Sequence, residues 1–366
     1  MSSAPAWQIG PFSRRGEVLR QQPDLRFTCP LLSTSVAWAA KDVFNPAAVV
    51  RDDQVHLLFR AEDAVGPYNG TSRVGLAVSD DGIRFEVVAE PVLYPEPDVW
   101  QPWEWPGGCE DPRLVESPDG GYVCLYTAFD GKASCLFVAT SDDLVHWQKH
   151  GPAFAGGRYA RRWSKSGAIV TETTDGRLKA AQLGDHYLMY WGEGTCFAAT
   201  SADLVRWTPV EFDAGADRYV SYKALGAPGS WDVHRVPGTK ALRPLLFPRP
   251  GRFDSLLVEP GPPAVRTHDG IVLIYNGAEV TRSEDGTSIN VRYQPGQALF
   301  DPSDPVSPIA RAESPFLRCD ESGALQGQVD NVCFGQGLVL FRDSWYLYYG
   351  MADSRIGCST APWLGT

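Results

Sequence analysis

Two adjacent carboxylates, Glu110 and Asp111, stand in the segment GGCEDPRLVE at residues 107–116, directly before an apolar run. Adjacent carboxylates repel each other, and a buried polar pocket can use that repulsion to separate their pKa values. Glu193 and Glu259 follow in MYWGEGT and LLVEPGPP, each at the border of an apolar segment. Asp111, Glu193 and Glu259 in one cavity could break a glycosidic bond, because one acid protonates the leaving oxygen while the others activate water.

Three basic residues accompany these acids: Arg60, Arg113 and Lys165. A neighbouring cation keeps a carboxylate ionised, whereas repulsion between carboxylates raises the pKa of one of them, so the set could divide into an acid and bases. Simpler roles stay open for some members. Glu110 could be satisfied by an arginine salt bridge, Lys165 could only neutralise a polar channel, and Asn45 could serve a turn.

These residues fall within a repeated strand pattern. The segments RVGLAVSDDGIRFE, CLFVATSDDLVHWQ and TCFAATSADLVRWT each contain a small-and-apolar strand, then Ser-Asp-Asp or Ser-Ala-Asp, a turn and an aromatic residue. Their acidic residues have the chemistry of a turn between two strands. The copies span residues 73–86, 135–148 and 195–208, with a degenerate fourth at 356–363.

A second pattern accompanies the first: a polar residue, a short strand, a turn, an alternating aromatic–apolar strand and another polar residue. A four-stranded unit of about 40–50 residues that restarts five times favours a β-propeller. We therefore predict an all-β fold, a five-bladed β-propeller with a central axial active-site pocket, in which residues 1–366 form a single domain. The five copies lie at residues 44–63, 110–130, 164–194, 259–279 and 330–353.

In a propeller the innermost strand of each blade lines the central channel, so polar residues at the same end of these strands converge on one mouth. The Trp-rich segment DVWQPWEWPGG at residues 98–108 is expected to form stacking walls for sugar rings at the rim. The inner strands supply Asn45, Glu110, Asp111, Lys165, Glu259, Asp330 and Asn331, and the next strands supply Arg60, Glu62, Asp63, Glu193, Asn276 and Asp353.

The overall composition narrows the class of partner and compartment. A net charge of −11 disfavours nucleic acid and anionic membranes as partners. The start MSSAPAWQIGPFSRRGE does not have the pattern of a signal peptide, and no window approaches an eighteen-residue apolar run, so we expect a cytoplasmic protein without a membrane span. The eight Cys form no C-x-x-C pair and are expected to be reduced and buried; no local cluster implies a metal or another cofactor.

The segment GGCEDPRLVE resembles the Gly-x-Glu-Asp-Pro-Arg signature of glycoside hydrolase family 130. Companion segments in order along the chain, including FNPAAVV, LLFRAED, SKSGAIV, EPGPPAV and YLYYGMADSRIG, extend the resemblance over most of its length. The resemblance implies a five-bladed propeller enzyme that acts on β-mannosides with inversion, either as a phosphorylase that uses phosphate or as a β-1,2-mannosidase that uses water. In both branches the residue that matches Asp111 is the proton donor, and in the phosphorylases it acts through a sugar hydroxyl.

The resemblance also suggests a branch. Phosphorylases of the family carry a basic His-Arg pair where this sequence has Glu193, and Glu259 adds a second acid that would repel phosphate. We therefore expect an inverting, exo-acting β-mannosidase for β-1,2-linked mannose, in which Asp111 protonates the leaving oxygen and the two glutamates activate water. One alternative is a β-mannoside phosphorylase that releases mannose 1-phosphate, because Arg113 and Lys165 could still hold an anion. A second is a non-catalytic glycan-binding propeller.

The expected partner is a mannose-containing oligosaccharide, while its aglycone and the oligomeric state stay open. We match no part of residues 209–250, between blades three and four, to the family pattern, and this stretch is a candidate for shaping the leaving-group subsites. The N-terminal segment 1–40 is a candidate for closing the ring. The resemblance implies substrate contacts by Asn45, Arg60, Asp63, Ser72, Arg73, Asn276 and Asp353, with Glu110, Arg113 and Lys165 beside the acids.

Overall fold

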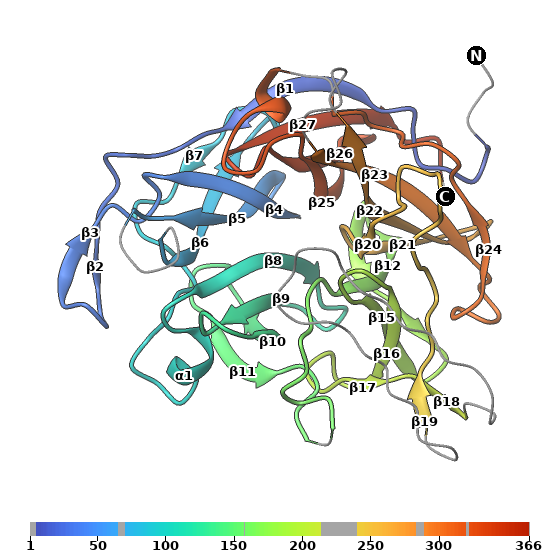
Figure 1. Cartoon of the computed structure of the whole chain (residues 1–366), viewed down its shortest axis with the longest axis horizontal. Helices are drawn as coiled ribbons and strands as arrows, with labels where there is room; N and C mark the ends of the chain where they lie inside the picture. The colour runs from blue at the N-terminus through green and yellow to red at the C-terminus, as the bar shows by residue number, and fades with distance from the viewer. Residues whose placement is uncertain are drawn as a thin grey trace.

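The computed structural model describes residues 5–64, 70–156, 158–213, 240–282, 289–319 and 322–365. This part of the chain is all-β, as predicted, whereas the five-bladed propeller stays a prediction. Helix is confined, within the described residues, to two short elements, α1 (Gln101–Glu104) and α2 (Ser322–Leu325). Figure 1 shows the strands gathered in groups around a common centre.

Within each group the strands pair antiparallel. The first contains β4 (Asp42–Arg51), β5 (Gln54–Glu62), β6 (Ser72–Ser79) and β7 (Glu86–Val87). The second contains β8 (Gly108–Glu116), β9 (Tyr122–Phe129), β10 (Ser134–Ser141) and β11 (Gln148–Pro152). The third contains β12 (Ala168–Thr174), β13 (Arg177–Ala180), β14 (Gln182–Leu183), β15 (His186–Trp191), β16 (Phe197–Ser201) and β17 (Thr208–Pro209).

The last two groups complete the arrangement. The fourth contains β20 (Leu257–Pro260), β21 (Ala264–Thr267), β22 (Gly270–Arg282), β23 (Ile289–Phe300) and β24 (Pro308–Arg311). The fifth contains β25 (Cys333–Phe341), β26 (Ser344–Met351) and β27 (Arg355–Pro362). In Figure 1 the strands β4, β8, β12 and β25 lie nearest the centre. Residues that open different groups therefore meet there.

The N-terminal strand β1 (Ser13–Leu19) pairs antiparallel with β27, from Ser13 opposite Thr360 to Leu19 opposite Ile356. It therefore forms the outer strand of the last group, while its role in closing a ring stays a prediction. A hairpin of β2 (Phe27–Cys29) and β3 (Thr34–Val36) follows it. In the predicted insertion 209–250, β18 (Glu211–Asp213) pairs with β19 (Lys240–Leu242), and residues 214–239 lie outside the described residues.

Burial on both faces holds the groups together. All nine residues of β8 are buried, as are seven of the eight in β9. A strand covered on both sides reads as a nearly continuous apolar run, which is the pattern of YVCLYTA. Side chains of β4, β5 and β6 pack with those of β8, β9 and β10 in one shared cluster, so neighbouring groups are joined by apolar contact.

The repeated acidic residues are turn residues, as predicted. The Ser79 hydroxyl accepts from the amide of Gly82 at 2.9 Å, and Asp81 Oδ1 accepts from the amides of Ile83 and Arg84, both at 2.8 Å. Equivalent bonds to Asp143 and Asp203 recur in the second and third groups. These carboxylates cap turns by accepting from backbone amides, which is a structural role.

The eight cysteines are free and buried, as expected from their apolar strands. Among the described helices, neither is long and apolar enough to cross a bilayer.

Candidate active site

Asn45 and Asp111 occupy matching β-bulges on the inner strands β4 and β8. The strand register shifts at both positions, and the two residues have left-handed φ angles of 49° and 50°. Asn and Asp tolerate this conformation better than most residues, and the proline after each lacks an N–H that a bulge would leave unpaired. A bulge re-aims the side chain of its extra residue. Here it turns the two side chains toward each other, and Asn45 Nδ2 donates to Asp111 Oδ1 at 2.7 Å.

Gly108, two residues before Glu110, allows β8 to approach β6 closely. Gly108 has a φ of 118°, and a Cβ on it would lie 2.1 Å from the carbonyl oxygen of Ser72. Only glycine fits such a contact without displacing the backbone. Gly108 of the motif therefore fixes the position of β8, and with it the position at which Glu110 and Asp111 enter the site.

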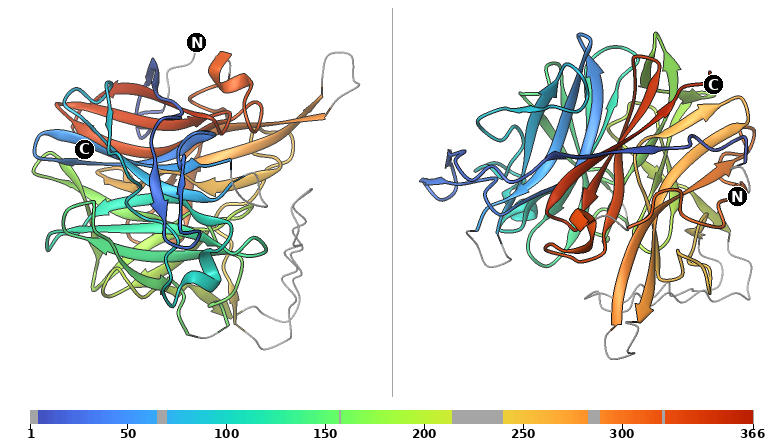
Figure 2. Two further views of the ribbon diagram at one scale, coloured as in Figure 1. Left: turned by 90° about the vertical axis from the view of Figure 1, so that its left-hand side faces the viewer. Right: turned by 90° about the horizontal axis from the view of Figure 1, so that it is seen from above.

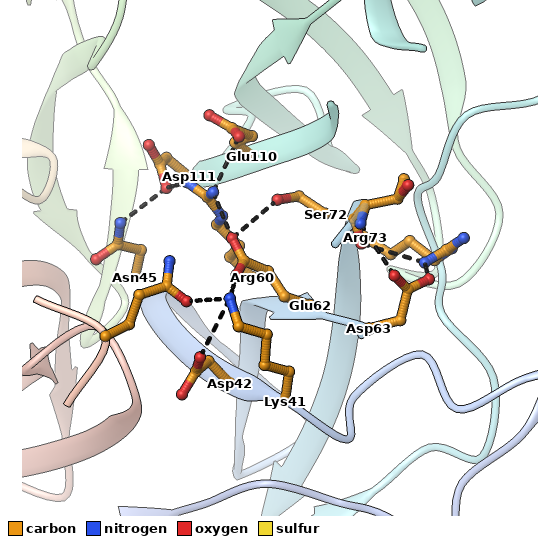
Figure 3. Close-up of polar contacts among 12 residues, drawn as sticks. Lys41, Asp42, Asn45, Arg60, Glu62, Asp63, Ser72, Arg73, Glu110 and Asp111 are labelled. Atoms are coloured by element: carbon orange, nitrogen blue, oxygen red, sulfur yellow. Dashed lines mark hydrogen bonds and ion pairs between the residues drawn. The ribbon is translucent and has the colours of Figure 1, made fainter. Parts of the chain in front are cut away.

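Arg60 is the cation that holds the acidic pair. Its Nη2 lies 2.9 Å from Glu110 Oε1 and 2.7 Å from Glu62 Oε1, and its Nη1 lies 3.1 Å from Asp111 Oδ1. Figure 3 shows the guanidinium between these carboxylates. The arginine salt bridge that was one possible role of Glu110 is thus present. Burial alone would lower the pKa of Arg60, but the three carboxylates raise it above its ordinary value.

Lys165 is the second cation of the site. Its Nζ lies 3.7 Å from Glu110 Oε2 and 3.9 Å from Asp111 Oδ2. Burial alone would lower the pKa of the ammonium, but surrounding carboxylates raise it above its ordinary value. These carboxylates are those of Glu193, Glu110, Asp111 and Glu259. One ammonium therefore interacts with all three acids proposed from the sequence, which places them around one centre.

The two inner acids differ in protonation. Burial would raise the pKa of Asp111, but Arg60, Lys165 and the Asn45 hydrogen bond lower it well below its ordinary value. For Glu259, burial and the neighbouring Glu193 carboxylate raise the pKa to about 8, against the opposing influence of nearby cations. Asp111 is therefore ionised at neutral pH, whereas Glu259 is largely protonated.

Arg113 and Ser166 support Glu259. The Ser166 hydroxyl donates to Glu259 Oε1, and Arg113 Nη2 donates to Ser166 Oγ at 2.9 Å and to the Pro260 carbonyl oxygen at 3.2 Å. Ser166 has a φ of 55°, the same left-handed conformation as Asn45. It was missed in the sequence, although KSG occupies the place in its repeat that EDP and FNP occupy in theirs.

Glu193 and Asp353 are half-buried at the same centre. Trp163 Nε1 donates to Glu193 Oε2 at 2.5 Å, which fixes the orientation of this carboxylate. Within the described residues, the Asp353 carboxylate has no hydrogen-bond or ion-pair partner. Burial, with Asp111 and Glu62 nearby, raises the pKa of Asp353 to about 7. Asp353 is therefore an acid that can carry a proton near neutral pH.

Tyr293 on β23 is a further site residue that the sequence did not reveal. Its pKa is raised to about 12 by burial and by the carboxylates of Glu259, Asp353 and Glu193, so its phenol lies among them. The only sequence signal was its position in an alternating strand, which a core tyrosine shares. A neutral phenol here is a hydrogen-bond donor for an anion or a sugar oxygen.

Asn276 and Gln336 have structural contacts at the centre. Asn276 Nδ2 donates to the Gly335 carbonyl oxygen at 2.9 Å, and its Oδ1 accepts from the Gly335 amide at 2.8 Å. Gln336 Nε2 donates to the carbonyl oxygens of Asn45 and Pro112. Both amides thus join inner strands to one another. The substrate contact expected of Asn276 stays a prediction, since its amide is already occupied.

Asp63, Arg73 and Ser72 lie to one side of the acids. Arg73 Nη1 forms an ion pair with Asp63 Oδ2, and both side chains are almost fully buried. The Arg73 guanidinium also lies over the Phe27 ring at 5.0 Å. Ser72 Oγ donates to Glu62 at 3.4 Å. In Figure 3 the Asp63–Arg73 pair points away from Asp111, so its geometry favours a structural role and its substrate contacts stay a prediction.

The expectation that Asp330 lies at the mouth was wrong. Asp330 is exposed in a turn, where its Oδ1 accepts from the Gly327 amide at 3.1 Å. The bulge of β25 lies later, between Gly335 and Gly337, and places Gln336 at the centre instead. The tryptophans Trp100 and Trp103 pack on Phe137, with ring centroids 5.7 and 5.5 Å apart, and are partly buried there. The sugar-stacking role expected of this segment stays a prediction.

Among the described residues, no group of three His, Cys, Asp or Glu side chains is arranged to hold a metal ion.

A family model described as β-1,4-mannooligosaccharide phosphorylase matches residues 15–224 and 231–363. The chain belongs to glycoside hydrolase family 130. This membership confirms the resemblance of the EDPR motif and its companion segments.

Relatives with assigned activities cover nearly the whole chain. A 1,2-β-oligomannan phosphorylase from Thermoanaerobacter sp. (strain X514) is 31% identical over 87% of this chain and 90% of its own length. A β-1,2-mannobiose phosphorylase from the same organism is 29% identical over the same shares. A solved structure covers 98% of this chain and 95% of its own, with 42% identity and a TM-score of 0.84. Its description states that this family of mannoside phosphorylases contains glycoside hydrolases that target β-1,2 mannosidic linkages in Candida mannan.

The prediction of hydrolysis as the main chemistry is contradicted, because the two relatives from Thermoanaerobacter are named phosphorylases. The prediction assumed that Glu193 and Glu259 would repel phosphate. In the structure Lys165 interacts with both glutamates, and the raised pKa of Glu259 removes much of its charge at neutral pH. The electrostatic objection to phosphate is therefore weaker than the sequence suggested.

Proposed function

We propose that this protein is a phosphorylase that acts on β-1,2-linked mannosides. An oxygen of inorganic phosphate attacks the anomeric carbon of the terminal mannose, and the bond from that carbon to the linking oxygen breaks with inversion. The linking oxygen takes a proton. The products are mannose 1-phosphate and an oligosaccharide that is one unit shorter.

The position of Lys165 carries the proposal. Its ammonium lies within 4 Å of both Glu110 and Asp111 and interacts with the two glutamates at which phosphate must arrive. Arg113 adds a second cation, held by Ser166 beside Glu259. When Glu259 is protonated, these cations are less fully compensated and can attract an anion, while the carboxyl proton and the Tyr293 phenol can donate to phosphate oxygens.

The same proposal includes the architecture. We interpret the five groups of strands as the blades of a five-bladed propeller, with the site where their inner strands meet. In this interpretation the terminal mannose enters the axial pocket, and the rest of the substrate extends outward. A pocket of this kind is compatible with exo action, since only a chain end can enter it.

Asp111 is the proposed proton donor, and its environment sets a condition on that role. An ionised Asp111 has no proton to give, and Arg60 with Lys165 keeps it ionised before substrate binds. The proton must therefore arrive from a neighbouring acid, and Asp353, with a pKa of about 7, and the phosphate monoanion can supply it. A sugar hydroxyl between Asp111 and the linking oxygen would complete such a relay.

Incubation with β-1,2-mannobiose, with and without phosphate, tests the proposal by proton and phosphorus NMR of the products. We expect mannose 1-phosphate and mannose in equal amounts, only when phosphate is present. Release of two mannose molecules without phosphate would refute phosphorolysis.

A further inference from the structure

The strands β22 and β23 form an arm that leaves the body of the molecule. They contain 13 and 12 residues and stay paired along their length, from Ile271 opposite Phe300 to Arg282 opposite Ile289. Both views of Figure 2 show this hairpin, in orange, projecting past the neighbouring strands.

The base of the arm belongs to the active site. Glu259 on β20 pairs with Asn276 on β22, and Ala278, two residues further along β22, lies opposite Tyr293, so Glu259 and Tyr293 are on one face of the sheet. The opposite face of the hairpin is covered at the same level: a Cβ on Gly277 would lie 2.7 Å from the Asp254 side chain. The face that carries Tyr293 is therefore the face turned toward the site.

Strand alternation extends this face outward. Directly opposed residues share a face and every second residue repeats it, so Val291, Val280 and Ile289 lie on the Tyr293 side, with Arg282 opposite Ile289. Val280 is 45% exposed and Ile289 is 66% exposed. The other face is polar there, with Glu279 Oε1 and Arg292 Nη1 4.0 Å apart. The arm thus exposes apolar side chains on the side of the site.

The spacing suits an extended substrate. At the rise of a β-strand, Val291 lies about 7 Å and Ile289 about 13 Å outward from Tyr293 along the strand. A chain that leaves the axial pocket past Tyr293 would meet the Val280–Val291 pair first and Ile289 next. The apolar C–H faces of sugar rings pack on such aliphatic side chains.

We propose that this arm is the wall of the outer subsites, and that Val280, Val291 and Ile289 contact the sugar units beyond the disaccharide. The inference rests on the proposed action on β-1,2-mannosides. The expected substrates are β-1,2-mannooligosaccharides of three or more units, which the arm binds through additional contacts. A disaccharide is too short to reach these side chains.

The test compares kcat/KM for β-1,2-mannobiose and for the tetrasaccharide in the full-length protein and in V280S/I289S. We expect the double variant to lose about tenfold on the tetrasaccharide, through a higher KM, and to keep its activity on mannobiose. The matched control is T281V/N290S, which changes a directly opposed pair on the other face of the same arm. It should change neither value.

An unchanged ratio between the two kcat/KM values, whether both fall equally or neither falls, would overturn the proposal. An unchanged ratio together with a shift from dimer to monomer in light scattering would assign the apolar face to a second copy of the chain instead. The rate for each substrate is measured as the total number of linkages broken, both with and without phosphate. A failure of phosphorolysis would therefore appear as phosphate independence, which leaves the chain-length comparison readable.

Discussion

Asn45 and Asp111, 66 residues apart in the chain, meet through a hydrogen bond of 2.7 Å between two β-bulges on neighbouring groups of strands. Each bulge places a polar side chain where a regular strand would aim it elsewhere. The bond uses one acceptor site of the carboxylate, Arg60 occupies another, and Lys165 approaches the second oxygen. The orientation of the proposed proton donor is thus set by three separate elements.

Replacing Asn45 by Ala should disorient Asp111 without unfolding the protein. A hydrogen bond to a charged group contributes about 2 kcal/mol, so we expect a loss of that size in the free energy of unfolding and a fall in kcat of at least tenfold. Urea unfolding and steady-state kinetics measure both. In the matched variant Asp111→Asn the fold should persist while turnover is abolished. Unchanged kcat in Asn45→Ala would show that the bond is not needed for catalysis.

Replacing Lys165 by Met should weaken phosphate binding more than sugar binding. The ammonium interacts with four carboxylates, and without it a phosphate dianion would face their uncompensated charge. We expect the KM for phosphate to rise at least tenfold and the KM for mannobiose to change by less than about threefold. Lys165→Arg, which keeps the charge, should recover part of the phosphate affinity. An equal rise in both KM values would contradict this role.

Stability should depend on pH through Glu259. Its carboxyl has an ordinary pKa of 4.5, which the fold raises to about 8, so between these values the folded protein holds a proton that the unfolded chain has lost. Unfolding then releases a proton, and the free energy of unfolding falls by up to about 1.4 kcal/mol per pH unit as pH rises through this window.

Urea unfolding at several pH values between 5 and 8.5 checks this slope. Glu259→Gln cannot ionise, so we expect a flatter dependence and a variant more stable than the parent above pH 8, although inactive. Asp353 contributes with the same sign between 3.8 and about 7, and Asp353→Asn serves as the comparison. A parent protein that becomes more stable as pH rises would contradict the raised pKa of Glu259.

Loss of the Asp63–Arg73 ion pair should cost stability and leave substrate affinity intact. Asp63→Ala would leave a buried guanidinium without its carboxylate, which costs about 3 kcal/mol. The double variant Asp63→Leu/Arg73→Met should recover much of this loss, because it removes both buried charges. Thermal unfolding and the KM for mannobiose separate the two roles. A large rise in KM in the double variant would support the substrate role expected from the sequence.

The sequence predicted the site residues that a local pattern of polar and apolar residues indicates. The repeated polar–strand pattern identified Asn45, Asp111, Lys165 and Glu259, because each borders an apolar segment. Positions set by tertiary contacts were harder to find. Gln336 lies in a bulge whose place cannot be read from GQG alone, and Tyr293 has the same sequence context as a core tyrosine. Hydrolysis was predicted in place of phosphorolysis because Glu193 and Glu259 were each counted as a full negative charge. In the structure, burial and the neighbouring Lys165 change how much of that negative charge remains.

The most direct test of the central claim is the stoichiometry between linkages broken and phosphate consumed. The purified protein is given β-1,2-mannotriose and a limiting amount of inorganic phosphate, and phosphorus NMR follows the phosphate while chromatography follows the sugars. We predict that one phosphate is converted to mannose 1-phosphate for each linkage broken, and that cleavage stops when phosphate is exhausted. Continued cleavage to free mannose after the phosphate is gone, or with none consumed, would contradict the account.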